Sequence, residues 1–521
     1  MASGRSADEA RTAPDGALEA VIGLEVHVQL ATATKMFCRC PNRYGAPPNT
    51  LTCPICLGYP GALPTPNHRA VDLAVRLAAA LGATVHERSR FARKSYFYPD
   101  LPKGYQITQY DHPLATGGSI PLGRRAIGLV RLHLEEDAGR LVHRTASEAA
   151  GDAGGSTLVD FNRCGVPLVE IVTRPELRTP GEARDLLGTL HRLLRYLEVS
   201  DASMEEGSLR CDANLSVRTP GDEALGTKVE IKNLNSFRHL ARSLEHEIER
   251  QGRTVADGAA VAAETRGFDP AHGVTFPVRS KERTADYRYF PEPDLPPLCV
   301  DARRRDAIAA ELPELPWRRR DRLAREHGLP PDEASVLTAS RELADYFERA
   351  VAARRRSGGT AADDAKAVAD WVRTEVLREL GERGIELDGR AGAHSPLREA
   401  LPPEDLAELS GLVADGTVSH SAAKDLLSAV WGTGEAPSAA VDRLGLAQIQ
   451  DDARLAEWVD AVVAAHPDEV ERYAAGKSAL LGFFVGRVMR RSGGRADPRR
   501  VRALLRSALD AAHRTDPVAP S

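Results

Sequence analysis

The sequence predicts an α+β protein in which an antiparallel-sheet domain is followed by helical domains. Three observations support this. Residues 21 to about 294 contain short runs that alternate between apolar and polar side chains, broken by Gly and Pro, with a few amphipathic helices between them. The proline-rich run at 291–297 cannot continue a helix or a central strand, so it is a candidate linker. After this run the sequence is rich in Ala, Arg and Leu with helical periodicity almost to its end.

The chain has 521 residues, of which 42% are hydrophobic, and this length is too great for one compact core. We therefore expect a disordered N-terminus over 1–18, a sheet domain over 19–296, a helical domain over 297–400 and a small helical tail domain over 401–515. The boundary near 400 follows from Pro402 and Pro403, which come after a loop rich in Gly, Ala and charge. The last six residues are also expected to be disordered.

The composition excludes several classes of protein. A net charge of −5 does not indicate nucleic-acid binding by the whole chain, although it leaves room for a local basic patch. The first sixteen residues carry three acids and no apolar run, which argues against a secretory signal or a transit peptide. No stretch approaches the roughly 18 apolar residues of a membrane span. Seven cysteines do not form a dense disulfide framework, so we expect a protein of the reducing cytoplasm with no membrane partner.

Two helices of the sheet domain are marked by their ends. One is expected after Asn67 and should stop at Gly82, with one apolar face of Ala70, Leu73, Ala74, Leu77 and Leu81. The other begins with a capping box, formed by Thr179 and Glu182 with Pro180 between them. Its apolar stripe consists of Leu186, Leu187, Leu190, Leu193, Leu194 and Leu197.

Four predicted strands, at 21–30, 127–134, 209–217 and 228–232, place apolar side chains on one face and polar groups on the other. If they share an antiparallel sheet, one face packs on helices and the opposite face gathers acids. The candidate residues of this face are Glu25, His27, Glu135, Glu136, Asp212 and Glu230. Glu136 falls on the side of Leu132 and Leu134 unless the strand ends or bulges at Glu135.

Such an acid-lined face suits a hard cation. Mg²⁺ prefers oxygen ligands and is usually held by a few carboxylates together with substrate phosphates, so the face suits Mg-ATP without a Gly-rich phosphate loop. The alternative is a sheet with one solvated face whose acids meet only water. Four strands of the same kind, one of them carrying a histidine, favour the cation site. The segment Gly476, Lys477, Ser478 is no phosphate loop, because Glu471 stands where the motif requires its first glycine.

Four cysteines form a C-x-C pair followed by a C-x2-C pair: Cys38, Cys40, Cys53 and Cys56. This spacing is close to that of a structural zinc ribbon, although the first pair is one residue tighter than usual. The alternative is a set of reduced, unligated thiols. Three further cysteines are isolated and expected to be buried: Cys164, Cys211 and Cys299.

A basic stripe lies near the end of the chain, where residues 487–506 contain eight arginines and a single acid, Asp497. A stripe of this kind neutralises nucleic-acid phosphates, with affinity that falls as salt rises. The alternative is a solvated helix face. The candidate nucleic-acid contacts are Arg487, Arg490, Arg491, Arg495, Arg499 and Arg500.

Several long segments of the chain are distinctive, and together they are far more specific than a short motif. They are GLEVHVQL (23–30), CPICLGYPGALP (53–64), YFYPDLPKGYQITQYD (96–111), HLEEDAG (133–139), VDFNRCGVPLVEIVTRPE (159–176), MEEGSLRCDANLSV (204–217), EIKNLNSF (230–237) and DYRYFPEPDLPPL (286–298). At these residues the sequence resembles the B subunits of tRNA-dependent amidotransferases, the GatB/GatE family, over nearly the whole chain from about residue 21 to 509.

The resemblance implies an antiparallel-sheet catalytic domain, similar to glutamine synthetase and guanidino kinases, followed by a helical domain and a YqeY-like tail that binds tRNA. The implied reaction is ATP-dependent phosphorylation of the side-chain carboxylate of Glu-tRNA(Gln) or Asp-tRNA(Asn), followed by attack of ammonia on the acyl phosphate. In this family a glutaminase A subunit supplies the ammonia and a small C subunit stabilises the heterotrimer. The sequence leaves open which of the two aminoacyl-tRNAs is the substrate.

The resemblance also implies roles for individual residues. Magnesium binding is carried over to the acids and the histidine of the sheet face, with Glu135 as a less certain neighbour. Catalytic roles are carried over to Lys94, Glu136 and Asp212, with Lys94 near the phosphates or the ammonia exit. Some family members have a zinc site at cysteines of this kind. Two rival functions remain, a non-catalytic tRNA-binding scaffold and a free-standing ATP-dependent ligase for small amino acids.

Overall fold

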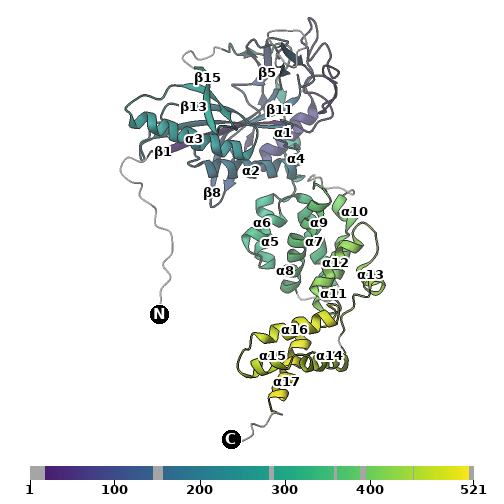
Figure 1. Cartoon of the computed structure of the whole chain (residues 1–521). Helices are drawn as coiled ribbons and strands as arrows, with labels where there is room; N and C mark the ends of the chain where they lie inside the picture. Colours follow the sequence, from purple (N-terminus) through teal and green to yellow (C-terminus); the bar gives the residue numbers. More distant parts are fainter. Residues whose placement is uncertain are drawn as a thin grey trace. The chain divides into compact units, whose positions relative to one another are not determined.

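The fold is described from a computed structural model of the whole chain (Figure 1). The structure describes residues 18–144, 156–280, 287–356, 361–387, 395–449 and 451–514. The predictions of disorder at residues 1–18 and over the last six residues fall outside these ranges, apart from residue 18 itself.

The chain divides into two compact units, Met1–Leu315 and Pro316–Ser521. The division lies after the proline-rich run because α4 (Ala302–Ala310) still packs on α1 (His68–Ala80) in the first unit. Nε of Arg304 in α4 donates to Oδ1 of Asp72 in α1 over 2.7 Å. These limits differ from the predicted boundaries at 296/297 and 400/401.

A large sheet organises the first unit, and its order among the described residues is β15-β14-β13-β12-β1-β11-β8-β5-β4-β16. All neighbouring pairs on this path are antiparallel except β13 and β14. The strands in that order are Val274–Ser280, Glu264–Asp269, Val229–Leu234, Leu209–Arg218, Glu19–Gln29, Pro167–Thr173, Arg125–Glu136, Tyr105–Gln109, Phe91–Ser95 and Phe290–Pro291. The predicted α+β fold with a mainly antiparallel sheet is thus confirmed.

Shorter strands complete the first unit. Three of them join the large sheet off its main path: β6 (Ala115–Thr116) and β7 (Ser119–Leu122) pair with β8, and β2 (Thr84–Val85) pairs with β6. Two separate ribbons are formed by β9 (Arg140–Arg144) with β10 (Ser156–Asp160), and by β3 (Arg88–Ser89) with β17 (Leu298–Cys299). The prediction that Cys299 is buried is wrong, because this residue lies exposed in the short β17; Cys164 and Cys211 are buried as expected.

Helices cover the apolar side of the sheet. Figure 1 shows α2 (Pro180–Tyr196) beside α3 (Phe237–Ala256), and α3 packs on β12. The helix caps form as predicted: Oδ1 of Asn67 accepts from the first turn of α1, and Oγ1 of Thr179 accepts from N of Glu182 over 3.1 Å. The leucine stripe of α2 is buried, as are the alternating apolar side chains of β1, namely Ile22, Leu24, Val26 and Val28. The opposite face of the central strands is therefore left for polar groups.

The second unit is helical. One apolar core spans both sides of residue 400, since Tyr346, Phe347, Leu406 and Leu426 all belong to it. Its elements are α5 (Pro316–His327), α6 (Pro331–Leu337), α7 (Arg341–Arg356), α8 (Ala361–Trp371), the π-helical turn η1 (Val372–Val376), α9 (Leu377–Glu382), α10 (Pro396–Ala400), α11 (Pro403–Ala414), α12 (His420–Val430) and α13 (Pro437–Leu444).

The last part of the second unit has a separate apolar core, which includes Phe484 and Val488. Its helices are α14 (Asp452–Ala464), α15 (Pro467–Ala474), α16 (Leu480–Arg491) and α17 (Pro498–Arg514). Within the described part of the chain, no helix has both the length and the apolar character needed to cross a membrane.

Candidate functional site

The polar face of the central strands carries a first cluster, the His27 group, made of His27 on β1, Glu135 on β8 and Glu170 on β11. Nε2 of His27 lies 3.2 Å from Oε2 of Glu170 and 3.7 Å from Oε1 of Glu135. Nε2 of His133 is 3.4 Å from the same Glu170 oxygen. Since one ligand atom from each member of the group lies within 4.8 Å of the others, the three suit a single metal ion.

A second cluster, the Asp212 group, consists of Glu25, Asp212 and Glu230 on β1, β12 and β13. Glu25 is directly opposite Asp212 in the β1/β12 ladder, which brings their side chains to the same face. Nζ of Lys232 bridges the other two acids, at 2.8 Å from Oδ2 of Asp212 and 2.9 Å from Oε1 of Glu230. The predicted gathering of Glu25, His27, Asp212 and Glu230 on one face therefore occurs.

Glu136 does not join them. β8 runs without a break to its end at Glu136, so this side chain follows Leu132 and Leu134 to the other face of the sheet. There its carboxylate pairs with Nζ of Lys103 and accepts from N of Ile107 over 3.0 Å. The proposed place of Glu136 among the magnesium ligands is not supported by this geometry, because alternation along an unbroken strand sends Glu135 and Glu136 to opposite faces.

Glu170 and His133 belong to the site although sequence reasoning did not select them. Glu170 is the one charged residue of PLVEIVT, a strand whose other side chains are almost all apolar. A lone carboxylate in such a strand is the signal that was available. His133 precedes Glu135 by two positions, and the same parity rule places both on one face.

Lys94 lies on β4 at the edge of this face. It is opposite Gln106 on β5, and its Nζ is 4.9 Å from the centre of the Tyr287 ring. Tyr289 stacks on Tyr110 with ring centres 4.0 Å apart, so an aromatic wall borders the lysine. Burial raises the pKa of Glu170, and the charge of Lys94 is the smallest of several influences that oppose this rise.

The charges of the His27 group are strongly coupled. Burial by itself lowers the pKa of His27, but the hydrogen bond and charge of Glu170 outweigh it and raise this pKa to about 9. Burial favours the protonated form of Glu170, yet the two facing histidines hold its pKa below the ordinary value. A metal ion that uses His27 as a ligand must therefore displace a proton from it.

A cavity of about 530 Å³ adjoins the Asp212 group, and Gln29, Arg210 and Asp212 line it. Arg210 is opposite His27 in the β1/β12 ladder, and its guanidinium lies 2.9 Å from Oδ2 of Asp137. The cavity is also lined by three further arginines, Arg43, Arg140 and Arg163. Its volume falls in the usual range for small-molecule sites, and its lining combines these arginines with four acids, Asp160, Glu205, Glu206 and Asp212. The arginines are suited to the phosphates of a ligand, and the acids are suited to a cation that such a ligand carries.

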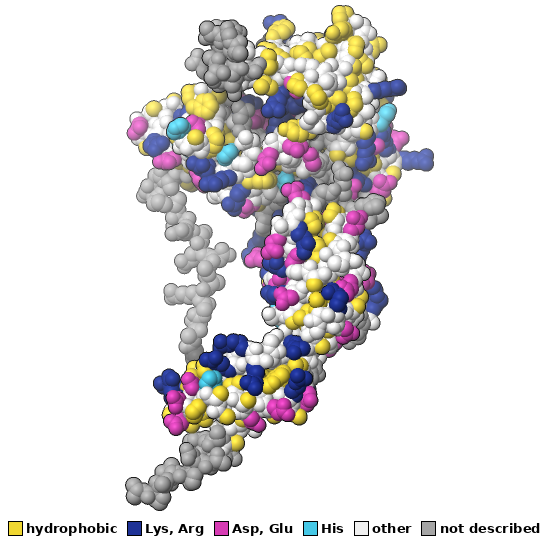
Figure 2. Space-filling view, turned by 45° about the vertical axis from the view of Figure 1, so that its right-hand side comes forward, with side chains coloured by type: hydrophobic (Ala, Val, Ile, Leu, Met, Phe, Trp, Pro, Cys, Tyr) yellow, Lys and Arg dark blue, Asp and Glu magenta, His cyan; other side chains and the backbone are white. Residues whose placement is uncertain are grey.

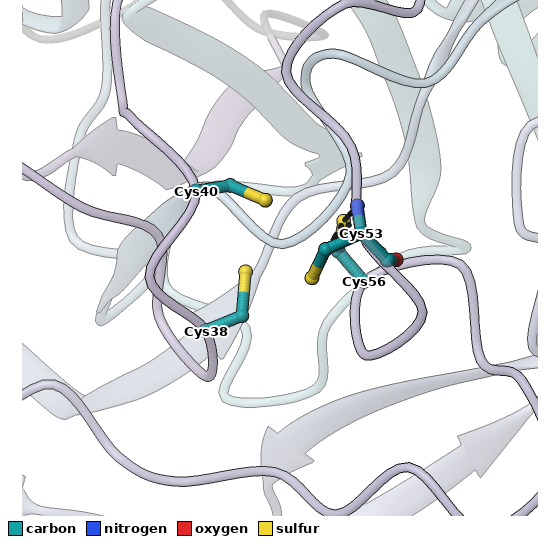
Figure 3. A group of neighbouring side chains, drawn as sticks. All are labelled: Cys38, Cys40, Cys53 and Cys56. Carbon is teal, nitrogen blue, oxygen red and sulfur yellow. Dashed lines mark hydrogen bonds between the residues drawn. The ribbon is translucent and has the colours of Figure 1, made fainter.

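The four cysteines come together as the spacing predicts. Figure 3 shows Cys38 and Cys40 reaching from one segment toward Cys53 and Cys56 on another. All four sulfurs lie within 4.8 Å of one another. The Sγ atoms of Cys53 and Cys56 are 3.9 Å apart, close to the roughly 3.8 Å expected for tetrahedral zinc with bonds of about 2.3 Å.

The electrostatics of the cysteine cluster also suit a cation. The hydrogen bond from Cys38, with help from the charge of Lys35, lowers the pKa of Cys56 to about 5. Burial raises the pKa of Cys40 to about 11. N of Cys53 donates to Sγ of Cys56 over 3.1 Å, which further stabilises a thiolate there. These contacts favour the thiolate form of Cys56, and the four sulfurs are close enough together to hold a metal ion.

The six candidate arginines of the tail are all exposed on the bundle α14–α17 or in its loop. The guanidinium carbon of Arg487 lies 5.1 Å from the centre of the Phe483 ring, and Arg500 pairs with Asp452 at 2.9 Å. Figure 2 shows dark blue side chains spread over this bundle. The surface offers cations to a polyanion, while the geometry leaves its partner unspecified.

Comparison with protein-family models matches the GatB/GatE catalytic domain at residues 20–306 and the GatB domain at residues 345–509. The chain is 49% identical to the B subunit of the aspartyl/glutamyl-tRNA(Asn/Gln) amidotransferase of Moorella thermoacetica over 495 residues, which cover 94% of this chain and 99% of that protein. It is 48% identical to the protein of the same name from Halorhodospira halophila over 498 residues, covering 94% of this chain and 99% of the relative. The similarity thus extends across both units.

Proposed function

The chain belongs to the GatB/GatE family, and we propose on this basis that it is the B subunit of an aspartyl/glutamyl-tRNA(Asn/Gln) amidotransferase. As such it is the part of the enzyme that phosphorylates the side-chain carboxylate of Glu-tRNA(Gln) or Asp-tRNA(Asn) with ATP. Ammonia then displaces the phosphate and leaves Gln-tRNA(Gln) or Asn-tRNA(Asn). Because aminoacyl-tRNA is the substrate, we place the protein in the cytoplasm.

The observation that carries this proposal is the pair of acid clusters, the His27 group and the Asp212 group, on one face of the sheet. The His27 group has ligand atoms close enough together for one metal ion, and the Asp212 group adds further carboxylates on the same face. Carboxylate oxygens together with substrate phosphates are the ligands that Mg²⁺ prefers. When bound, Mg²⁺ neutralises charge on the transferring phosphoryl group. Glu135 and Glu170 take part in this set, and Glu136 is left out of it.

The residues around the clusters have separate tasks. Lys94 offers a cation at one edge of the face, and Arg210 offers another beside the 530 Å³ cavity. Both cations are suited to stabilising negative charge that develops on a phosphoryl group. Asp212 is proposed to hold a cation, and because it lines the cavity, we propose that nucleotide and acceptor carboxylate meet beside it. The cysteine cluster is proposed to hold a structural zinc.

An ammonia source is expected from an A subunit, and an exposed apolar surface is a candidate for its docking. Tyr59 is 58% exposed, Phe97 is 89% exposed and Tyr98 is 60% exposed. These residues come from two loops that meet, since a Cβ on Gly58 would lie 2.3 Å from the Lys103 side chain. Exposed apolar patches of this kind typically mark protein interfaces. We propose that a C subunit completes the heterotrimer.

A non-catalytic tRNA scaffold is the second candidate function. The exposed arginines of the tail favour tRNA binding whether or not the chain performs chemistry. The scaffold differs from the enzyme in one respect: it is indifferent to the loss of Asp212. This difference makes the two functions separable by experiment.

The test is transamidation by the complex reconstituted with A and C subunits, Mg-ATP, glutamine and either Glu-tRNA(Gln) or Asp-tRNA(Asn). We expect Asp212→Ala to bind tRNA normally and to lose ATP-dependent phosphorylation and product. Asp222→Ala is the matched control, because Asp222 is an exposed acid in the turn that follows the same strand. Full turnover by Asp212→Ala would leave the chain as a scaffold.

A further inference from the structure

Lys232 is held between two carboxylates that the proposed function assigns to a cation. It lies on β13, and its ammonium is 2.8 Å from Oδ2 of Asp212 and 2.9 Å from Oε1 of Glu230. The ammonium therefore sits at the point where these two acids of the Asp212 group converge. Its side chain as a whole is 38% exposed, so the lysine is only partly enclosed.

A divalent cation and this ammonium cannot share the two carboxylates without strong repulsion. Charges of like sign a few ångströms apart repel strongly in a partly buried site, where water screens them weakly. Mg²⁺ also demands near-octahedral access to its oxygen ligands, and an ammonium on the same oxygens blocks part of that access. Binding of the metal to these acids therefore requires the ammonium to move away.

Two of the three acids have hydrogen-bond partners other than the lysine. Oγ1 of Thr265 on β14 donates to Oε2 of Glu230 over 3.1 Å, and this oxygen is not the one that faces Lys232. Nδ2 of Asn214 on β12 donates to Oε1 of Glu25 over 2.9 Å. Neutral groups of the sheet thus help to position Glu25 and Glu230, whereas the carboxylate of Asp212 accepts from the lysine itself.

The other cations of the face have their own partners. Arg210 binds Asp137, and Lys94 lies against the ring of Tyr287 beside the His27 group. Lys232 differs from both because it contacts two acids of the Asp212 group directly. Its flexible four-carbon stem allows the ammonium to swing by several ångströms, and Asp212 itself lines the 530 Å³ cavity.

We propose that Lys232 is a built-in competitor for the cation of the Asp212 group, and that a divalent metal displaces its ammonium toward the phosphates of the bound nucleotide. This inference rests on the proposed function of the site. It makes metal binding and nucleotide binding cooperative, because the metal frees a phosphate-binding cation and the nucleotide stabilises that cation in its new place. In the absence of nucleotide, the lysine thereby raises the metal concentration that is needed to occupy the Asp212 group.

The first test measures Mn²⁺ binding by electron paramagnetic resonance in the reconstituted complex without nucleotide. We expect Lys232→Met to tighten one class of Mn²⁺ site by about tenfold or more, since a competing charge is gone. Lys232→Arg should bind Mn²⁺ like wild type, because it keeps the charge. The control is Lys228→Met, which removes an exposed lysine just before the same strand. Mn²⁺ affinity that is unchanged or weaker in Lys232→Met overturns the proposal.

The second test measures binding of a non-hydrolysable ATP analogue at saturating Mn²⁺. Lys232→Met should weaken it by about tenfold, in the opposite direction to its effect on the metal. Unchanged analogue binding contradicts the transfer of the ammonium to phosphate. If Lys232→Met melts early by circular dichroism, Lys232→Gln repeats both tests with a polar side chain. Since neither test depends on turnover, failure here is distinct from a failure of Asp212→Ala to abolish transamidation.

Discussion

Nε2 of His27 and Oε2 of Glu170 lie 3.2 Å apart on β1 and β11, where the two residues are directly opposed in the antiparallel ladder. The sequence predicts His27 as a site residue, but it does not predict Glu170. The contact raises the pKa of His27 to about 9 despite the burial that opposes the charged form. A proton and a divalent cation therefore compete for the same imidazole nitrogen.

Metal binding at the His27 group should depend on pH. Because His27 must lose one proton to become a ligand, Mn²⁺ affinity is expected to rise about tenfold per pH unit between pH 7 and pH 9. Titrations followed by electron paramagnetic resonance check this. In Glu170→Gln the pKa of His27 should fall, so the pH dependence above pH 7 should flatten. Binding that is independent of pH in the wild type would contradict the assignment.

The same pair should contribute to stability in a defined pH window. The folded pKa of His27 is raised from 6.5 to about 9, so its contribution is fully present below pH 6.5 and is lost as pH rises through 9. In metal-free protein, Glu170→Gln is expected to lower the free energy of unfolding by about 2–3 kcal/mol at pH 6, with a smaller difference at pH 9.5. Urea unfolding measures this, with Glu223→Gln, an exposed acid, as control.

Glu135 and Glu136 should behave differently when each is replaced by Gln. Glu135→Gln is expected to weaken Mn²⁺ binding by about tenfold or more, since it removes a charged oxygen from the His27 group. Glu136→Gln should leave Mn²⁺ affinity unchanged and destabilise the fold by about 3–5 kcal/mol, because Lys103 is then buried without its counter-charge. Adding Lys103→Met to Glu136→Gln should restore much of that stability. Equal metal loss in both single variants argues against the placement of Glu136.

Zinc content should depend on the cysteine cluster alone. Cys53→Ser is expected to lower bound zinc from about one equivalent to well below one, because tetrahedral zinc in a structural site needs its four ligands. Atomic emission on protein purified without chelator gives the count. Cys299→Ser is the matched control, since that thiol is exposed and outside the cluster. Zinc-free wild-type protein would show that the thiols are simply reduced.

The tail arginines should govern salt-dependent tRNA binding. Arg490→Ala with Arg491→Ala is expected to weaken tRNA binding and to reduce the slope of log K against log salt by about one to two, as phosphate contacts are lost. Filter binding at several salt concentrations measures both. Arg318→Ala removes an exposed arginine from α5, outside the tail bundle, and should change neither the affinity for tRNA nor the slope. An unaltered slope in the double variant would show that these arginines lie on a solvated helix face and do not contact tRNA phosphates.

Much of the fold follows from local patterns. The apolar alternation of β1 and β12 is strong enough to predict which side chains share a face. It therefore predicts that Glu25, His27 and Asp212 lie on the same face. The capping box at Thr179 predicts the start of α2 because its hydrogen bonds are local. The cysteine spacing likewise predicts the cluster that forms.

By itself, then, the sequence determined the class of fold, the polar face and most of its acids, since these depend on residue type and period. Only the tertiary structure decided which strands are neighbours and in what register. Register places Glu170 against His27 and brings Lys232 to Asp212, while the unbroken end of β8 turns Glu136 away. These choices depend on packing between segments far apart in the chain, where a shift of one residue exchanges the two faces of a strand.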